Sequence, residues 1–431
     1  SLRMIPIFDN ERAGFVKRVR GDGFLDDKKV YDGVSDIMMD IRKEKDAALI
    51  RYTEKFDKVS LLPEELLVTK EEIDMAYKQI DKDLLSVIQQ AILNVASYSL
   101  KQKEKSFLWN KTEGIKIGQK VTPLRSVGIY IPGGTAPLIS SVIMNAVPAY
   151  CAGVKEIVMC TPPIIDAARI VAANEAHVTK IYKAGGAQAI FAMAFGTETI
   201  PKVDKITGPG NIYVAYAKKM AYGYCGIDMV AGPSEIMIIA DETADAGFIA
   251  ADMLSQAEHD KLSVSSLLTT SKQLAEKVIK QISIQKDKLK RSDIITECIK
   301  NNSAIYIGKD IMECIDILNE CAPEHAEIVT KDAEFYSDFI TQAGAVFVGP
   351  YSPEPLGDYY AGPNHTLPTA GTARFFSVLG VYDFMKKSSV IQYDRTELEK
   401  AYKSISLFAK CEELDAHANA VNIRFEGKKD E

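Results

Sequence analysis

Histidine is scarce in this chain of 431 residues, and four of its five histidines lie in short runs that also carry carboxylates or amides. An imidazole nitrogen is a good zinc ligand, and Asp, Glu or amide oxygens can complete such a site. The cysteines are widely spaced and form no Cys-x-x-Cys pair, so a cysteine-bound zinc is disfavoured. The pattern indicates a metal centre with acid–base groups around it, built from Gln256-x-x-His259, Ala322-Pro-Glu-His-Ala326, Leu356 to His365 and Glu412 to His417.

Two of these runs permit specific chemistry. Gln256 and His259 share one face if the segment is helical, and the weak Gln ligand would let a metal site exchange substrate. The alternative is an ordinary polar cluster at a helix end. Glu324 and His325 could serve as two separate acid–base groups, since His titrates near neutral pH and a Glu beside a metal can activate water. The alternative is a surface Glu next to a half-buried His.

The remaining candidates are more ambiguous. Asp358 follows two prolines and a glycine, so it could be a metal ligand, a turn former or a cap. Cys321 could form a thiohemiacetal during aldehyde oxidation, although a lone Cys in apolar surroundings is usually inert. His177 is isolated and is interpreted as structural.

Composition limits the class of protein. The chain is 47% hydrophobic and 26% charged, with a net charge of −7, which is ordinary for a soluble globular protein and argues against nucleic-acid binding. No apolar run approaches the ~20 residues needed to span a membrane, and no signal peptide is recognisable at the N-terminus. Free, scattered thiols are typical of a reducing compartment, so we expect a cytoplasmic protein.

Hydrophobic periodicity predicts helices over most of the first ~105 residues, with a capping box at Thr69 to Glu72. From Gly118 onwards, short apolar strands alternate with helices of about 10–15 residues, which indicates βαβ units around parallel sheets. We therefore expect an α/β protein with two Rossmann-like but incomplete parallel-sheet domains, a helical N-terminal region and a small C-terminal unit. The long segment from Gly349 to Phe375 is expected to be a functional loop.

Three glycine-rich turns each follow a predicted strand and precede a helix. In open parallel sheets, ligands bind beyond the carboxyl ends of the strands, where helix N-termini offer free N–H groups to phosphate. None of the turns is a full Gly-x-Gly-x-x-Gly, so they favour a phosphate-bearing ligand only modestly over ordinary strand–helix turns. The turns are Pro132 to Thr135, Ala184 to Gln188 and Gly208 to Asn211.

Seven long motifs occur in one order along the chain, and together they resemble the histidinol dehydrogenase family over most of its length. The motifs are Tyr130-Ile-Pro-Gly-Gly-Thr-Ala-Pro137, Asp204-Lys-Ile-Thr-Gly-Pro-Gly-Asn211, Asp228-Met-Val-Ala-Gly-Pro-Ser-Glu235, Leu254-Ser-Gln-Ala-Glu-His259, Ala322-Pro-Glu-His325, Pro363-Asn-His-Thr-Leu-Pro-Thr369 and Ala416-His-Ala-Asn-Ala-Val421.

The resemblance implies an NAD-dependent four-electron dehydrogenase that oxidises L-histidinol through L-histidinaldehyde to L-histidine, the last steps of histidine biosynthesis, with two NAD+ and one Zn2+. It also implies a homodimer with shared active sites, in which the C-terminal segment reaches the partner subunit. The implied domains are an arm over 1–24, a metal and substrate domain of 25–124 plus 235–380, an NAD-binding domain over 125–234, and the segment 381–431.

The family's site residues match positions of this chain one by one. The implied acid–base pair is Glu324 and His325. The implied zinc ligands are Gln256, His259, Asp358 and His417. The implied substrate contacts are Ser234, Gln256, His259, His325, Asp358, Glu412 and His417, and the implied NAD contacts are Tyr130, Gln188 and Asn211.

Three positions depart from the family pattern without replacing a site residue: Ala326, Glu413 and Asp260 with the following Lys261. These departures bear on the shape of the substrate pocket more than on the type of reaction. Two alternatives stay open, namely an aldehyde dehydrogenase acting through Cys321 and a non-catalytic zinc- and nucleotide-binding regulator.

Overall fold

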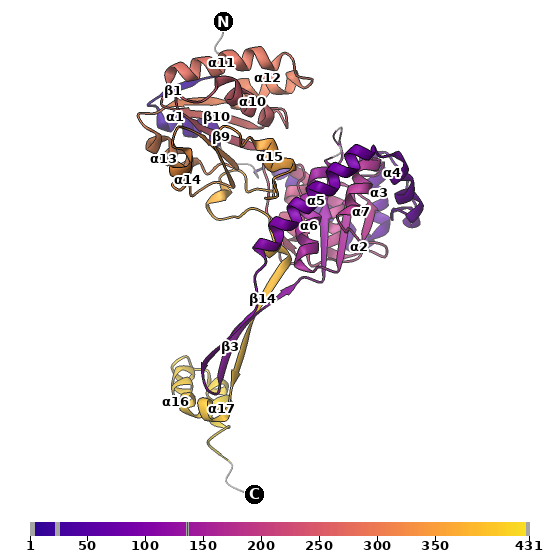
Figure 1. Ribbon diagram of the computed structural model, residues 1–431. Coiled ribbons are helices and arrows are strands. Elements are labelled where there is room, and N and C mark those ends of the chain that lie inside the picture. Colours follow the sequence, from indigo (N-terminus) through magenta and orange to yellow (C-terminus); the bar gives the residue numbers. More distant parts are fainter. Residues whose placement is uncertain (1–4, 22–25, 135, 137, 428–431) are drawn as a thin grey trace. The chain divides into compact units, whose positions relative to one another are not determined.

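The computed structural model describes residues 5–21, 26–134, 136 and 138–427. It divides into two compact units. Unit 1 comprises residues 1–102 and 124–384, and unit 2 comprises residues 103–123 and 385–431. The fold is of the predicted α/β class, with two wholly parallel sheets in unit 1 (Figure 1).

The first parallel sheet of unit 1 has five strands in the order β6-β5-β4-β7-β8. The strands are β4 (Ser126–Tyr130), β5 (Glu156–Thr161), β6 (Lys180–Lys183), β7 (Lys205–Thr207) and β8 (Gly226–Ile227). The helices between them are α6 (Ile139–Ala152), α7 (Ala167–Glu175), α8 (Gly186–Phe195) and α9 (Ile212–Ala221). Strands alternate with helices here as the sequence predicted, except that no strand was predicted at β8.

The second parallel sheet has six strands in the order β1-β11-β10-β9-β12-β13. The strands are β1 (Ile7–Asp9), β9 (Glu235–Ala240), β10 (Val264–Thr269), β11 (Ala304–Ile307), β12 (His325–Val329) and β13 (Ala345–Val348). Its helices are α1 (Arg12–Arg20), α10 (Ala246–Ala257), α11 (Lys272–Lys286), α12 (Ser292–Asn302), α13 (Ile311–Cys321), α14 (Ala333–Ser337) and α15 (Glu354–Tyr359).

The two sheets share one topology. If β4 in the first sheet and β9 in the second are each numbered 1, both sheets have the strand order 3-2-1-4-5. Strand β1 is added beside β11 at the edge of the second sheet. This is the arrangement of a doubly wound sheet that stops one strand short of the six-stranded Rossmann order. The expectation of incomplete Rossmann-like sheets is therefore confirmed.

Helices cover both faces of the six-stranded sheet. One apolar cluster joins the sheet to α10, α11 and α12, and another joins its other face to α1 and α13. In Figure 1 the indigo β1 and α1 lie among the orange elements of this sheet, far from them in sequence. Helices were predicted over most of the N-terminal region, and the described part of the arm also holds β1, which pairs in parallel with β11.

The other N-terminal helices pack beside the five-stranded sheet. Helix α2 contacts α8 and α9, and α4 contacts α7. The predicted capping box is confirmed, because the Thr69 hydroxyl accepts from the Glu72 N–H and the Glu72 carboxylate accepts from the Thr69 N–H. The predicted domain boundaries stay a prediction. The helices are α2 (Lys28–Glu44), α3 (Asp46–Asp57), α4 (Lys70–Gln79) and α5 (Lys82–Gln102), with a 3-10 turn η1 (Pro63–Glu65).

Unit 2 is an antiparallel sheet with two helices. The sheet has the order β14-β3-β2. Sequence periodicity missed β2 and β3, which follow directly after the N-terminal helices. The elements are β2 (Phe107–Thr112), β3 (Ile115–Pro123), β14 (Met385–Tyr393), α16 (Arg395–Cys411) and α17 (Asp415–Asn422), while the 3-10 turns η2 (Thr372–Arg374) and η3 (Val381–Phe384) belong to unit 1.

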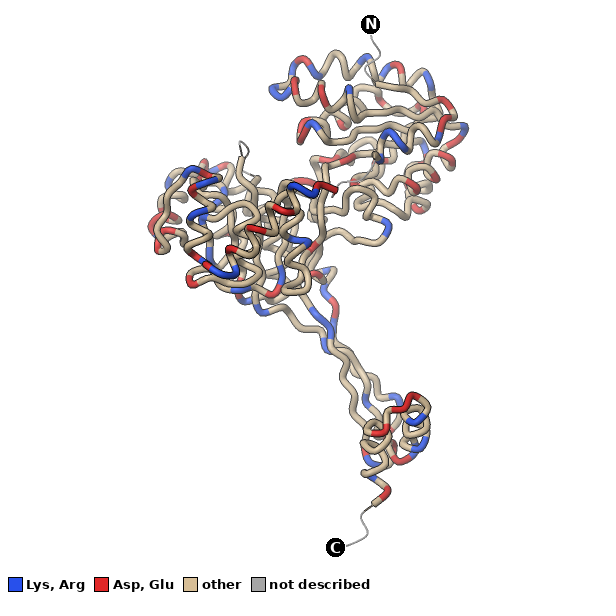
Figure 2. Tube along the Cα trace, turned by 180° about the vertical axis from the view of Figure 1, so that it is seen from behind, with Lys and Arg blue, Asp and Glu red and all other residues tan. Residues whose placement is uncertain are grey.

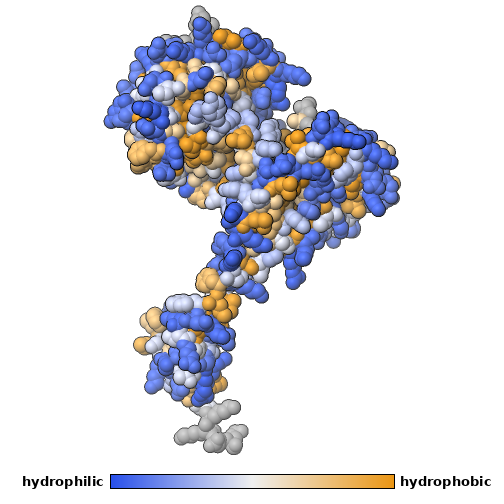
Figure 3. Space-filling model, viewed as in Figure 1, coloured by the Kyte–Doolittle hydropathy of each residue, from blue (hydrophilic) through white to orange (hydrophobic). Residues whose placement is uncertain are grey.

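Several large apolar side chains of unit 2 are exposed. Every residue of β2 is exposed, and so is every residue of β14 after Met385. Ile391 is 75%, Leu407 71% and Phe408 74% exposed, and Figure 3 shows apolar residues at the surface along these strands. A small antiparallel sheet needs a covered apolar face for stability, so this unit is suited to packing against another surface.

Charges of both signs alternate along the chain, and Figure 2 shows no large field of Lys and Arg. Among the described residues, no helix is long and apolar enough to cross a membrane.

Candidate active site and metal centre

Glu324 and His325 lie at the amino end of β12, beside the amino end of β9. The register pairs His325 with Ile236, which places Glu235, the first residue of β9, next to the predicted acid–base pair. Glu235 and Glu324 are each only 5% exposed, and His325 is 3% exposed. Buried charged groups need partners, and these three residues supply them for one another.

Glu235 and Glu324 exchange hydrogen bonds between backbone and side chain. The Glu235 N–H donates to Glu324 Oε2 at 2.9 Å, and the Glu324 N–H donates to Glu235 Oε1 at 3.0 Å. Each buried carboxylate therefore accepts a main-chain hydrogen bond at a fixed position, which immobilises the Glu324 side chain.

The His325 ring is oriented by the same strand. Its Nδ1 lies 3.0 Å from the Glu235 carbonyl oxygen, which can only accept a hydrogen bond. A neutral His325 ring that donates from Nδ1 to this carbonyl carries its free lone pair on Nε2. Nε2 is buried without a hydrogen-bond partner and lies 3.1 Å from Glu354 Oε1 and 3.8 Å from Asp358 Oδ1.

The second half of the site comes from α10 and α15. Gln256 lies in the last turn of α10 and is fully buried, while His259 follows just after the helix. With the Gln256 amide oriented so that its nitrogen faces acceptors, it donates to the two Glu354 carboxylate oxygens at 2.6 and 3.2 Å. This orientation leaves the amide oxygen of Gln256 as its available ligand atom. Segment 349–375, expected to be a loop, thus contains the short helix α15 that carries Glu354 and Asp358.

Three of these side chains could hold one metal ion. Ligand atoms of His259, Glu354 and Asp358 lie within 4.8 Å of one another. Zinc binds imidazole nitrogen and carboxylate oxygen atoms at roughly 2.0–2.2 Å. These three side chains fit zinc if their ligand atoms move slightly closer together. The buried, unpartnered Nε2 of His325 faces the same group, which places an acid–base group next to the candidate metal.

Burial and neighbouring charges shift the pKa values here in opposite directions. Burial raises the pKa of Glu324 and of Glu354 to about 8 in each case. Burial opposes the protonation of His325, but the carboxylates of Glu354 and Glu324 raise its pKa well above the ordinary value. Burial lowers the pKa of His259, which keeps its ring neutral and its lone pair free for a metal.

The predicted cofactor residues lie at the carboxyl edge of the five-stranded sheet. Tyr130 ends β4, and its hydroxyl accepts from the Gly186 N–H at 2.9 Å at the start of α8. Gln188 is buried in the first turn of α8. Asn211 caps α9, accepting from the Val214 N–H at 3.1 Å. Thr135 of the first glycine-rich turn lies outside the described residues.

The turn at Gly208 requires glycine. Its φ is +125°, and a Cβ there would lie 2.1 Å from the Tyr130 carbonyl oxygen. A buried ion pair between Lys218 and Asp228 stabilises this turn. Lys218 donates to the Gly208 carbonyl at 2.8 Å, and Asp228 accepts from the Gly208 N–H at 3.0 Å. The close backbone approach and the two helix N-termini fit the phosphates of a dinucleotide.

The predicted residues fall into three groups. Gln256, His259, Glu324, His325 and Asp358 come together at the amino edge of the six-stranded sheet, with Ser234 directly before β9. Tyr130, Gln188 and Asn211 gather at the carboxyl edge of the five-stranded sheet. Glu412 caps the C-terminus of α16 and His417 lies in α17, both in unit 2.

Sequence reasoning gave no role to two residues of the site, Glu235 and Glu354. A signal existed for Glu235, because a carboxylate opens an otherwise apolar strand, Glu235-Ile-Met-Ile-Ile-Ala240, and a buried charge needs a partner. Glu354 stands between two prolines and carries no spacing signal.

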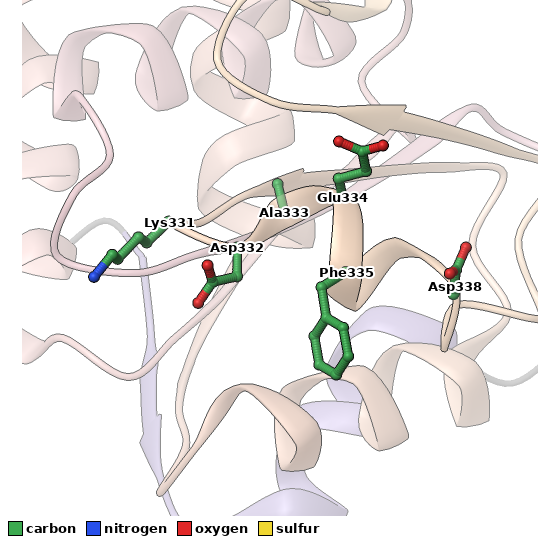
Figure 4. A pocket seen from close by; sticks show the side chains of 6 residues that line it. All are labelled: Lys331, Asp332, Ala333, Glu334, Phe335 and Asp338. Atoms are coloured by element: carbon green, nitrogen blue, oxygen red, sulfur yellow. The ribbon is translucent and has the colours of Figure 1, made fainter.

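The opposite edge of the six-stranded sheet is a different environment. The hollow shown in Figure 4 follows β12 and is lined by Lys331, Asp332, Ala333, Glu334, Phe335 and Asp338. Nearby, Asp241 accepts from the Lys331 N–H at 2.9 Å. This acidic edge does not suit phosphate, and none of the predicted site residues lies there.

Comparison with known proteins agrees with this geometry. The sequence profile of the histidinol dehydrogenase family matches residues 23–425. The chain is 50% identical to a histidinol dehydrogenase of Clostridium acetobutylicum over 427 residues, covering 95% of this chain and 99% of the relative. It is 50% identical to that of Bacillus subtilis over 395 residues, covering 91% and 92% of the two chains.

A solved structure is also similar. The crystal structure of histidinol dehydrogenase from Elizabethkingia anophelis superimposes with a TM-score of 0.93 at 40% identity, covering 98% of each chain. The match extends over both units, and the candidate site residues described above lie inside the matched region. The chain is an oxidoreductase that belongs to the histidinol dehydrogenase family.

Proposed function

We propose that this enzyme oxidises L-histidinol through L-histidinaldehyde to L-histidine, with two NAD+ as oxidants and one zinc ion, in the cytoplasm and at the end of histidine biosynthesis. The observation that carries the proposal is the buried Glu324–His325 pair beside the donors His259, Glu354 and Asp358, in a chain of this family. Acid–base groups next to a metal are what alcohol oxidation followed by aldehyde hydration requires.

We propose Gln256, His259 and Asp358 as zinc ligands from one chain and His417 as the ligand from a second copy. When bound, zinc supplies Lewis-acid chemistry and a fixed point for the nitrogens of the substrate. Ser234 and Glu412 join the ligands and His325 as substrate contacts. Binding fixes the orientation of the alcohol carbon in advance. Less entropy is then lost on reaching the transition state, so the barrier to hydride transfer is lower.

His325 is the base of the first oxidation in this proposal. When the His325 ring is neutral, its Nδ1 hydrogen is directed to the Glu235 carbonyl, so the Nε2 lone pair faces the site and can take the hydroxyl proton. Two neighbouring carboxylates, from Glu354 and Asp358, stabilise the imidazolium that results.

Glu324 is the base of the second stage, in which water adds to the aldehyde. Burial raises the pKa of Glu324 to about 8. A base is most effective when its pKa lies near the working pH, so the ionised fraction of Glu324 is a stronger base than an exposed carboxylate. The hydrate then loses the second hydride.

NAD+ is the hydride acceptor of both oxidations, and Tyr130, Gln188 and Asn211 are its proposed contacts. Tyr130 and Asn211 already bond to main-chain N–H groups at the start of α8 and α9. In this role they shape the helix N-termini that face the phosphates.

We propose a homodimer in which unit 2 supplies Glu412 and His417 to the partner's site. The exposed apolar side chains of unit 2, among them Leu407 and Phe408, support an interface there. Mixed dimers of inactive His417→Ala and inactive His259→Ala chains should regain part of the activity, because one of the two sites is then intact. Verified heterodimers without any activity would show that each site is built within one chain.

The direct test is an assay of the zinc-loaded enzyme with histidinol and excess NAD+. Two NADH per histidinol, with histidine as product, is the expected result. One NADH per histidinol with release of aldehyde would limit the enzyme to the first oxidation, and no NADH would exclude the proposal. The zinc- and nucleotide-binding regulator is the alternative that the last outcome would favour.

A further inference from the structure

Arg20, the last residue of α1, reaches the predicted acid–base pair through Glu235. Its Nη1 donates to Glu235 Oε2 at 3.0 Å, and its Nη2 donates to Glu235 Oε1 at 3.2 Å. The Arg20 side chain is 22% exposed and that of Glu235 is 6% exposed. A two-pronged Arg–carboxylate pair fixes the angle as well as the distance between its partners.

Glu235 in turn restrains both Glu324 and His325. Its carboxylate accepts from the Glu324 N–H, its own N–H holds the Glu324 carboxylate, and its carbonyl orients the His325 ring. One residue thus sets the main-chain position of Glu324, the direction of its side chain, and the ring hydrogen of His325.

We propose that Arg20 and Glu235 together form a positioning brace for the Glu324–His325 pair, so that an N-terminal helix contributes to catalysis without touching substrate. We call this pair the Arg20–Glu235 brace, and its effect on turnover rests on the proposed function. Glu235 and Glu324 are 89 positions apart in sequence, and Arg20 lies a further 215 positions from Glu235, so the brace ties three distant segments to one point.

The brace differs from an ordinary surface ion pair. Arg12 lies on the same helix and pairs with Asp316 and Glu320 at 2.8 and 2.6 Å, but its side chain is 41% exposed and its partners are 69% and 43% exposed. Exposed pairs contribute little to stability, and those of Arg12 touch no site residue. Arg12→Gln is therefore the matched control for Arg20→Gln.

The first experiment measures kcat and both KM values for the zinc-loaded variants. Arg20→Gln should lower kcat about tenfold or more, as loss of supporting hydrogen bonds does elsewhere, while the KM for NAD+ stays within twofold. Arg20→Lys should recover part of the loss, because Lys keeps the charge but not the fork. Arg12→Gln should keep kcat within twofold.

Glu235→Gln is the second variant, and it keeps the size of the side chain. The Arg20→Gln/Glu235→Gln double variant should lose no more kcat than the worse single variant, because both residues act through one contact. The proposal is overturned if Arg20→Gln keeps kcat within twofold, if Arg12→Gln loses as much, or if the two losses multiply independently.

A measurement without substrate separates this proposal from the proposed function. With only five histidines in the chain, ¹⁵N-histidine spectra can resolve the His325 ring. At a pH high enough to make the His325 ring neutral, the wild type should show one tautomer, with hydrogen on Nδ1, and Arg20→Gln should show a mixture. Identical spectra would overturn the brace. A spectral change in an enzyme that does not oxidise histidinol would keep the brace and exclude the function.

Discussion

The two parallel sheets of unit 1 have the same strand order but use opposite edges. The five-stranded sheet gathers Tyr130, Gly208 and Asn211 at the carboxyl ends of its strands, where doubly wound proteins bind ligands. The six-stranded sheet gathers Glu235, Glu324 and His325 at the amino ends. A shared topology therefore does not fix which edge carries chemistry.

Helix ends are consistent with the ligand proposed for each edge. The N-termini of α8 and α9 face the carboxyl edge of the five-stranded sheet, and the partial positive charge there attracts phosphate. The C-terminal ends of α10 and α13 lead to Gln256, His259 and Glu324 at the amino edge of the other sheet. The partial negative charge of helix C-termini favours a cation.

The variant with the largest expected effect removes a proposed metal donor from the amino edge of the six-stranded sheet. His259→Ala should lower kcat about a thousandfold or more, since a metal stabilises the transition state by several kcal/mol. The purified variant should also lose zinc, measured by elemental analysis after dialysis, while NAD+ binding by fluorescence stays within twofold. Full zinc content in this variant would contradict the assigned centre.

The matching test on the other edge is Gly208→Ala. A Cβ there would lie 2.1 Å from the Tyr130 carbonyl at a φ of +125°, so the turn must move. We expect the KM for NAD+ to rise about tenfold and the stability to fall by ~2 kcal/mol or more, with zinc content unchanged. Gly223→Ala is the control, because its φ is +105° but nothing lies within 4 Å of a Cβ. Equal effects in the two variants would show that backbone strain, and not the turn's position, is responsible.

The edges also differ in how far sequence could predict them. Periodicity and glycine-rich turns located the strands of both sheets except β1 and β8, because each βαβ unit repeats a local pattern. The unit 2 strands β2 and β3 escaped, since Phe107-Leu-Trp-Asn-Lys-Thr112 lacks a clear alternation and is exposed throughout. The other neighbour of β3 is β14, more than 260 residues later.

The candidate site shows the same limit. The types and spacing of Gln256, His259, Glu324 and His325 suggested chemistry, and the family motifs suggested Asp358 and His417. Glu235 depends on the register between β9 and β12, which pairs Ile236 with His325, and no local pattern encodes that register. Glu354 depends on how α15 packs beside α10, which is likewise a property of the folded chain.

Glu324 provides a pH test of the amino edge in metal-free protein. Burial raises its pKa from 4.5 to about 8 in the folded state, so the folded state keeps a proton that the unfolded state has lost. The stability from this group is full below pH 4.5 and is lost as the pH rises towards 8. At about 1.4 kcal/mol for each pH unit of difference, the loss amounts to a few kcal/mol.

Glu324→Gln removes this titration. Urea unfolding at several pH values between 5 and 8.5, in the presence of EDTA, should show the wild type losing stability relative to Glu324→Gln as the pH rises. Parallel curves for the two proteins would mean that the folded enzyme accommodates the Glu324 carboxylate in its ionised form.

The smallest expected effect concerns Cys321, the nucleophile of the aldehyde dehydrogenase alternative. This thiol is 1% exposed, and burial raises its pKa to about 12. Because the thiolate is the reactive form, the buried Cys321 is poorly suited to attack an aldehyde at neutral pH. Cys321→Ser should keep both oxidations within twofold and lower stability by about 1 kcal/mol.

Exposed Cys411 gives the chemical control for that variant. Iodoacetamide should label Cys411 in urea-dissociated chains and leave Cys321 unlabelled in the native enzyme, with the sites read by mass spectrometry. If Cys321→Ser formed the first NADH but not the second, the hypothesis of covalent catalysis by Cys321 would be supported. The chemistry would then depend on the end of α13, and the water-based role of Glu324 would be wrong.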